Sequence, residues 1–201
     1  MFLIGPLVKT LTICIAEFIQ MKRSMPDWLW EKLQEIPAPS YPFESVRYHP
    51  VSARTDDGEI HPCTVIFGQN AYLKMGGQFS KGRTFIDINS VVDVFPSVYQ
   101  LPINIANRIY DFVETRMGGY DFALTMRDGL VFYYSLGNRV DFINYPPSYG
   151  QSDIVDVEVG FVPEKHHFDK ANVLQGPPYV WCLYDEPADV ALSLRYEEQK
   201  I

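Results

Sequence analysis

The chain has 201 residues, of which 47% are hydrophobic and 21% are charged, so it is long and apolar enough to bury a core. It carries 17 Lys and Arg against 25 Asp and Glu, a formal net charge of −8. A nucleic-acid-binding surface needs a stripe of basic residues. The densest basic cluster here is the pair Lys22 and Arg23, which argues against nucleic-acid binding.

The three cysteines, Cys14, Cys63 and Cys182, lie far apart and show no metal-type spacing. Exported proteins that depend on disulfides usually carry denser, paired cysteines. The sequence therefore predicts reduced, buried thiols and a cytoplasmic protein. A single bridge between Cys63 and Cys182 is the alternative that export would allow.

Residues 1–24 contain the most apolar stretch of the chain, with apolar side chains at three- and four-residue spacing and Lys9 and Glu17 outside that stripe. This pattern predicts an amphipathic helix. The two charges argue against a membrane span. No basic residue precedes the apolar run and no cleavage site follows it, which argues against a signal peptide. A signal or anchor is the first alternative, and a natural start at Met21 or Met25 is the second.

After this segment the sequence predicts one helix and then a series of strands. Pro26 suits a first helical turn, and Leu29, Leu33 and Ile36 lie along one side, so we expect a helix over 26–36. Alternating apolar residues predict strands over 46–53 and 60–67, a turn at 68–70 that leads to residues 72–75, and strands over 84–88 and 90–94.

The second half begins with the clearest helical pattern inside the chain. Apolar residues share one face over 101–116, and Gly118 and Gly119 follow as a stop. Strands are then expected over 120–126 and 130–135, joined by an Asp128-Gly129 turn, and over 139–143. Prolines predict an irregular C-terminal arm with a strand at 179–184 and a strand or helix at 190–196.

Two segments, Ser90–Val94 (SVVDV) and Asp153–Val157 (DIVDV), resemble each other. Each follows the same predicted order of strand, polar turn, aromatic strand, glycine break and short strand. This predicts a duplicated β-meander, with the helix at 101–116 linking the copies. Chance similarity is the alternative, because strands draw on few residue types.

These elements predict an α+β fold. Two meanders with one apolar face each must bury those faces, so we expect an antiparallel sheet, sandwich or partial barrel with a single shared core and N-terminal helices packed on it. Residues 1–24 form a helical segment in this interpretation, and residues 25–201 form one domain.

Few residues are candidates for catalysis or metal binding. His61 and Cys63 lie two apart on one strand face, as a base and a nucleophile would, but a core cysteine beside an edge histidine is the simpler interpretation. His166 and Asp169 are weak metal-ligand candidates in what is more simply a solvated loop. The sequence contains no phosphate-loop, serine-hydrolase or zincin motif, so we predict no catalytic residue, metal or cofactor.

Aromatic residues are unusually frequent, at 14% of the chain. Phe132 and Tyr134 alternate on one side of the strand at 130–135, and Phe142 and Tyr145 follow closely. An exposed aromatic face often marks an interface, so these four are the candidate binding residues. Filling of a two-sided core is the alternative.

The sequence thus predicts a bacterial-type, non-catalytic binding protein that associates with itself, as a homodimer, through an aromatic sheet surface. A second protein or a small apolar ligand is the alternative partner. The alternative functions are a small-pocket enzyme with a lone His or Asp as acid or base, and an acidic inhibitor or immunity-type protein.

Overall fold

The computed structural model describes residues 23–40, 48–74, 83–112, 114–115, 117–160 and 173–186. The predicted N-terminal helix over 1–24 and the element at 190–196 lie outside these ranges, apart from residues 23 and 24. Within them the protein has an α+β fold with two mostly antiparallel sheets, as the sequence predicts. No helix in the described ranges is both long and apolar enough to cross a membrane.

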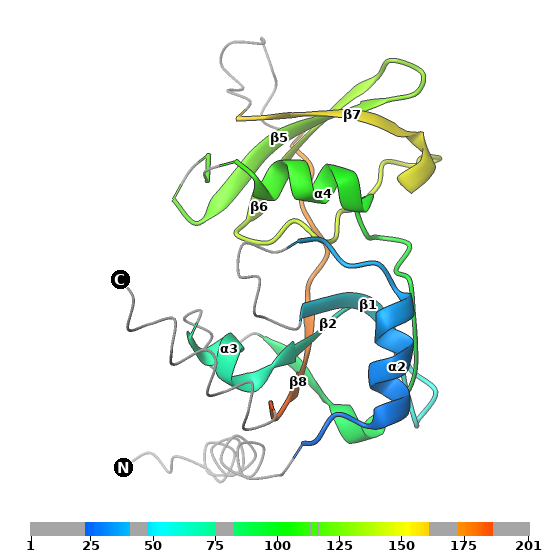
Figure 1. Ribbon diagram of the computed structural model, residues 1–201. Coiled ribbons are helices and arrows are strands. Elements are labelled where there is room, and N and C mark those ends of the chain that lie inside the picture. The colour runs from blue at the N-terminus through cyan, green and yellow to red at the C-terminus, as the bar shows by residue number, and fades with distance from the viewer. Residues whose placement is uncertain are drawn as a thin grey trace, which may run out of the picture.

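The two sheets lie one above the other in Figure 1, each with its own helices. The first sheet has the order β3 (Thr84–Asp87), β8 (Val180–Tyr184), β2 (Ile60–Gly68), β1 (Tyr48–Thr55) and β4 (Val91–Phe95). The second has the order β6 (Val131–Gly137), β5 (Gly119–Met126) and β7 (Ile154–Val159). The helices are α2 (Asp27–Glu35), α3 (Gln69–Lys74) and α4 (Ile103–Tyr110). Strand β8 pairs in parallel with β2 and β3, whereas the other pairs are antiparallel.

The predicted helix over 26–36 is confirmed as α2. Pro26 occupies its N-cap, and Leu29 and Leu33 are fully buried in a cluster on one face of the first sheet. Burial of each leucine contributes about 1.5–3 kcal/mol. Because strand β2 is covered on both faces, its consecutive residues Val65, Ile66 and Phe67 are all buried, as expected for a central strand.

Both predicted hairpin turns are present and have the same geometry. Gly58 and Gly129 adopt φ angles of 86° and 87°. The residue after each glycine donates its backbone N–H to an aspartate, Asp57 or Asp128, at 3.0 Å. A positive φ is accessible to glycine at little cost, whereas a Cβ atom makes it unfavourable.

Gly58→Ala and Gly129→Ala are each expected to lower the free energy of unfolding by about 1–2 kcal/mol, because alanine disfavours a positive φ. Urea unfolding measures both values. Gly150→Ala is the matched control, since Gly150 has an extended backbone and open space around it. Equal stability of all three variants and the wild type would contradict this assignment of the turns.

In each sheet the strand that carries one of the two similar segments pairs with the first strand of a hairpin, β1–β2 or β5–β6. Strand β4 pairs with β1, and strand β7 pairs with β5, each with a register shift near the hairpin turn. A short 3₁₀ turn precedes each of these strands, at Ile88–Ser90 and at Gln151–Asp153. The two similar sequence segments therefore occupy corresponding places in the two sheets.

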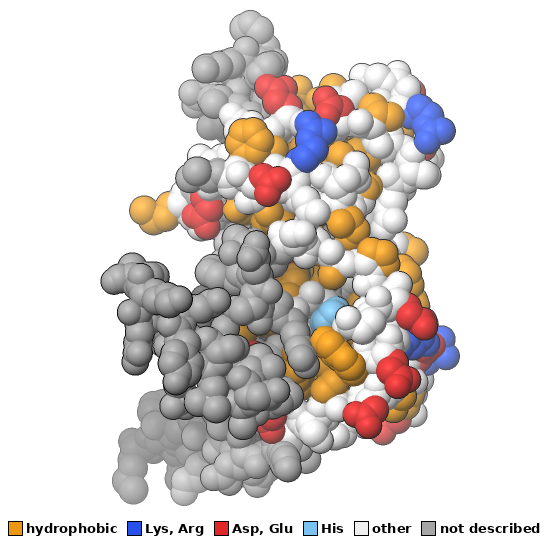
Figure 2. Space-filling view, in the orientation of Figure 1, with side chains coloured by type: hydrophobic (Ala, Val, Ile, Leu, Met, Phe, Trp, Pro, Cys, Tyr) orange, Lys and Arg blue, Asp and Glu red, His pale blue; other side chains and the backbone are white. Residues whose placement is uncertain are grey.

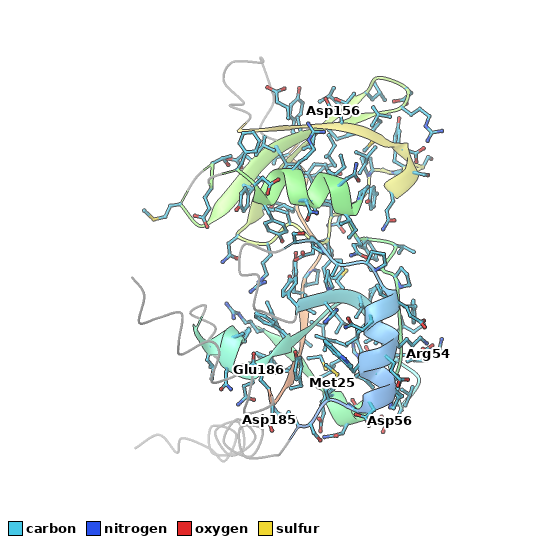
Figure 3. The ribbon with its side chains drawn as sticks, in the orientation of Figure 1. Met25, Arg54, Asp56, Asp156, Asp185 and Glu186 are labelled. Carbon is cyan, nitrogen blue, oxygen red and sulfur yellow. The ribbon has the colours of Figure 1, made fainter. Side chains whose placement is uncertain are left out.

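In each sheet a helix also forms an ion pair with the strand that carries the similar segment, β4 or β7. Lys32 of α2 pairs with Asp93 of β4, and Arg108 of α4 pairs with Asp156 of β7 at 2.7 Å. Figure 3 shows Asp156 on the second sheet, on the strand that α4 lies against. Such exposed pairs contribute only about 0–1 kcal/mol each, so they mark equivalent positions rather than hold the sheets together.

Three sequence-based expectations for individual elements are wrong. Residues 69–74 form the helix α3, where the sequence predicts a turn at 68–70 and no helix after it. Helical and extended patterns are hard to separate in so short an apolar run. Helix α4 ends at Tyr110 rather than near 116 because the core ends there: Phe112, expected on its buried face, is 54% exposed.

The third wrong expectation is a strand over 139–143, where only Phe142 makes an isolated bridge, to Gln100. Residues 140–143 are all at most 1% exposed, so their side chains are buried in both directions. The backbone N–H groups of Val140 and Asp141 donate to the hydroxyls of Tyr110 and Tyr179, at 3.0 and 3.1 Å. Two tyrosine hydroxyls thus take the place of a neighbouring strand at the N–H groups of Val140 and Asp141. The segment also bonds to residues 99–101, because the Leu101 N–H donates to the Asp141 carbonyl and the Ile143 N–H donates to the Tyr99 carbonyl, both at 2.9 Å.

The predicted single core is also wrong. One apolar cluster lies between α4 and the second sheet, and two further clusters cover the opposite faces of the first sheet, against α2 and α3. Neither a central linking helix nor N-terminal helices packed on it are observed in the described ranges, because α4 packs on β7 and α2 packs on β4. Residues 137–143, which follow β6, and residues 173–179, which lead into β8, lie between the two sheets (Figure 1).

Candidate functional site

The four aromatic residues predicted to bind a partner lie largely in the interior. Tyr134 is 1% exposed and stacks on Phe122 with ring centroids 5.3 Å apart. Phe142 is fully buried against Tyr179 at 5.1 Å. Neither side chain can contribute to an exposed surface.

Phe132 and Tyr145 are half-buried and pack against the cluster of the second sheet. The ring of Phe132 packs against that of Tyr149, with the ring centroids 5.2 Å apart. The Tyr145 hydroxyl donates to the carbonyl of Gln100 at 2.7 Å. The structure therefore brings Phe132, Tyr134 and Tyr145 into one cluster and places Phe142 in another. Their arrangement matches the alternative of a filled core.

The candidate catalytic pair does not form a reactive site. Cys63 is 3% exposed, and burial raises the pKa of its thiol to about 12. It is therefore protonated at neutral pH, whereas the thiolate is the nucleophile. His61 lies 3.9 Å from Glu59 instead.

The metal-ligand candidates His166 and Asp169 lie outside the described residues. Among the residues that the structure describes, no group of three or more His, Cys, Asp or Glu side chains could hold a metal ion.

A cavity of about 520 Å³ lies where the two sheets meet, and we call it the junction cavity. Helix α3 and strands β3 and β8 contribute residues from the first sheet, and β6 contributes from the second. Residues of the segment that follows β6 and of the segment that precedes β8 complete the wall. The described lining residues are Tyr72, Arg83, Thr84, Leu136, Gly137, Asn138, Arg139, Phe142, Gln175, Gly176, Pro177, Pro178, Tyr179 and Trp181. None of these residues is acidic.

Two arginines in this wall converge on one indole ring. The guanidinium carbons of Arg83 and Arg139 lie 5.8 and 4.8 Å from the ring centroid of Trp181. Arg83 also lies over Tyr72 and donates a hydrogen bond to its hydroxyl, and Arg139 lies over Tyr48 at 4.9 Å. Guanidinium groups held on aromatic rings are stabilised by the negative ring face, which fixes their positions beside the cavity.

A buried polar cluster lies directly behind this wall, and we call it the tyrosine cluster. The carboxylate of Asp141, 1% exposed, accepts hydrogen bonds from the hydroxyls of Tyr48, Tyr110 and Tyr179. Tyr48 belongs to the first sheet and Tyr110 to the helix of the second. The cluster therefore links the two sheets through one carboxylate, and Tyr179 belongs both to it and to the cavity wall.

Burial shifts the pKa values of the whole cluster. It raises the pKa of Asp141 above its ordinary value, while the hydrogen bond from Tyr48 and the charge of Arg139 partly oppose this effect. Burial, reinforced by the charge of Asp141, raises the pKa values of Tyr48, Tyr110 and Tyr179 well above the ordinary value of a tyrosine. All three tyrosines are consequently protonated donors at neutral pH.

The residues of this site were missed in the sequence, with the exception of Phe142. Arg83 directly precedes the strand predicted at 84–88, and Arg139 begins the strand predicted at 139–143; neither position carries a binding motif. Their shared place at the start of two short apolar segments is the signal that could have indicated them. Even so, only the fold shows that both reach Trp181.

Comparison with known proteins places the chain in no group. No protein-family model, curated protein or solved structure matches it.

Proposed function

We propose that this protein binds a small anionic ligand in the junction cavity. The observation that carries the proposal is the convergence of two guanidinium groups on Trp181, in the wall of a cavity that no described acidic side chain lines. A volume of about 520 Å³ falls in the range of small-ligand sites, roughly 300–1,000 Å³. Arginine binds carboxylates and phosphates through charge-assisted, paired hydrogen bonds.

The overall charge of the protein does not oppose such binding. The net charge is −8, and acidic side chains are scattered over the face shown in Figure 2, whereas basic ones are few. At physiological ionic strength, however, charges more than about 8 Å apart are largely screened. Among the described lining residues only Arg83 and Arg139 are charged, so the charged side chains that a ligand would contact there are positive.

We also propose that the chain consists of two copies of one helix–hairpin–strand unit. The first copy is α2, β1, β2 and β4, and the second is α4, β5, β6 and β7. The matched turns, 3₁₀ segments, strand pairings and helix–strand ion pairs support this proposal. In this arrangement α4 is the first element of the second copy. The ligand site then lies between the copies, where small-molecule sites often occur.

Self-association through an aromatic sheet surface is a weaker proposal than ligand binding. That proposal requires the four aromatic residues to be exposed, yet Tyr134 and Phe142 are buried. We still propose a binding protein, but with its ligand site in the junction cavity, which Phe142 lines, and not on the sheet surface.

An enzymatic role is the second candidate, because groups with shifted pKa values lie beside the cavity. Two features make it the weaker one. The oxygens of Asp141 already accept tyrosine hydrogen bonds, and Asp141 is not among the lining residues. Tyr179 does line the cavity, but its raised pKa keeps it protonated at neutral pH, so it is a poor general base.

Binding of anions by the purified protein tests the proposal. Inorganic phosphate and a panel of organic anions should raise the melting temperature of the wild type in a concentration-dependent way. Arg83→Gln and Arg139→Gln should weaken the affinity roughly tenfold or more, because each removes a charge-assisted hydrogen bond.

Arg54→Gln is the matched control. Arg54 is exposed, lies 6.0 Å from the centroid of the Phe95 ring, and is on the α2 side of the first sheet, away from α3 (Figure 3). It should bind anions as the wild type does. Because Arg83 is also exposed, its variant is expected to fold, and unchanged anion binding by Arg83→Gln would refute the proposal.

A further inference from the structure

We infer that the ligand of the junction cavity is a hydroxylated anion of about monosaccharide size, with the chemistry shared by sugar phosphates and sugar acids. This inference rests on the proposed function and adds what the rest of the cavity wall recognises. Its basis is the hydrogen-bonding capacity of the lining side chains, considered one type at a time.

The first type donates only. The guanidinium groups of Arg83 and Arg139 have no acceptor atom, so they suit the anionic group of a ligand and cannot satisfy a ligand N–H or O–H. No described lining residue is Asp or Glu, so none of the described side chains offers a carboxylate to a ligand N–H or O–H. A ligand with several cationic or purely donating groups is therefore disfavoured.

The second type both donates and accepts. Asn138, Gln175 and Thr84 line the cavity, and all three are exposed. The side-chain amide groups of Asn138 and Gln175 make no hydrogen bond to other described residues. A carboxamide or a hydroxyl can donate and accept, and so can each hydroxyl of a sugar, so these three side chains match hydroxyl groups in either direction.

The aromatic rings argue against a flat aromatic ligand. Tyr72 is 1% exposed and Trp181 is 6% exposed, and arginine side chains already lie against both rings. Their faces are thus not available to stack on a ligand. The side chains that the cavity exposes are mainly polar, which also disfavours the small apolar ligand considered from the sequence.

The cavity size is consistent with a monosaccharide. A volume of about 520 Å³ lies in the lower half of the range of small-ligand sites, roughly 300–1,000 Å³. A phosphorylated or carboxylated monosaccharide fits this volume and leaves room for bridging waters, which commonly complete such sites.

Calorimetric titration of the full-length protein tests the inference with five probes: glucose 6-phosphate, glucuronate, inorganic phosphate, glucose and phenyl phosphate. At least one of the two sugar anions should bind roughly tenfold or more tightly than inorganic phosphate, since it gains hydrogen bonds from its hydroxyls. Glucose should bind far more weakly than either. The better of the two sugar anions then identifies phosphate or carboxylate as the anionic group.

Variants of nearly unchanged shape separate the two halves of the site. Asn138→Leu combined with Gln175→Met should reduce the affinity for the sugar anion to that for inorganic phosphate, and leave phosphate binding unchanged. Asn89→Leu, an exposed asparagine outside the cavity wall, is the control and should change neither affinity.

The outcomes distinguish this inference from the proposed function. If inorganic phosphate binds as tightly as both sugar anions, or phenyl phosphate binds more tightly than either, the hydroxylated ligand class is wrong while anion binding stands. If none of the four anionic probes binds, the proposed function is wrong and the inference fails with it.

Discussion

Asp141→Ala is expected to lower the free energy of unfolding by about 3–5 kcal/mol. The substitution removes the acceptor of three tyrosine hydroxyls, from the buried Tyr48 and Tyr110 and the partly buried Tyr179. A buried donor without a partner costs about 1–3 kcal/mol. Removal of a buried charge offsets part of the sum. Urea unfolding followed by circular dichroism measures the loss.

Asp141→Asn is the matched control because it keeps an acceptor oxygen and removes the charge. We expect it to be more stable than Asp141→Ala at every pH. The comparison with the wild type also depends on pH. Burial raises the folded-state pKa of Asp141 above the unfolded value, so its contribution to stability is complete below the unfolded pKa and is lost as the pH rises through the folded pKa.

The stability of the wild type relative to Asp141→Asn should therefore increase as the pH falls from neutral towards about 4. Unfolding curves at several pH values between these limits check the sign. Two results would contradict the role assigned to the tyrosine cluster. One is a stability, relative to Asp141→Asn, that decreases as the pH is lowered, and the other is an Asp141→Ala loss below about 1 kcal/mol.

The second large effect is expected in alkaline solution. The folded-state pKa values of Tyr48, Tyr110 and Tyr179 lie well above the unfolded value because of burial and the charge of Asp141. Their contribution to stability is thus present below the unfolded pKa, near 10, and is lost above it. Each tyrosine should lower the free energy of unfolding by about 1.4 kcal/mol per pH unit in that range, or roughly 4 kcal/mol per unit for all three.

A graded series of variants isolates this slope from other alkaline effects. Tyr110→Phe should reduce the slope by about 1.4 kcal/mol per pH unit, and Tyr110→Phe with Tyr179→Phe by about twice that amount. Urea unfolding at pH values between 9 and 11 gives the slopes, whatever the stability of each variant at neutral pH. Equal slopes in the wild type and both variants would show that these tyrosines are not buried as described.

Local patterns in the sequence predicted most of the elements. Alternation and glycine turns located β1, β2, β5 and β6, and the proline and apolar spacing around Leu29 and Leu33 located α2. Each of these signals depends on residues close together in the chain. The resemblance between SVVDV and DIVDV also pointed to two strands, β4 and β7, that pair in equivalent ways.

The failures involve elements whose conformation depends on distant residues. The segment at 139–143 is extended and apolar like a strand, but the N–H groups of Val140 and Asp141 bond to hydroxyls of Tyr110 and Tyr179, about 30 and 40 residues away in the chain. Burial of Tyr134 and Phe142 likewise depends on packing against Phe122 and Tyr179. Tertiary contacts of this kind leave no periodic signal.

The junction cavity could not be found from the sequence for the same reason. Arg83 and Trp181 are nearly a hundred positions apart, and they meet because β8 pairs in parallel with β3. A parallel pair needs a long connection, so neither hydrophobic alternation nor turn chemistry indicates it. The partner of each arginine is defined by this topology alone.

Titration of the isotope-labelled protein with glucose 6-phosphate, followed by amide and indole resonances, tests the location of the ligand site most directly. The largest saturable shifts should belong to the amides of Gly137, Asn138 and Gly176 and to the indole of Trp181, all in the cavity wall. Saturable shifts confined to other regions, such as the α2 side of the first sheet, would show that the ligand site is not the junction cavity.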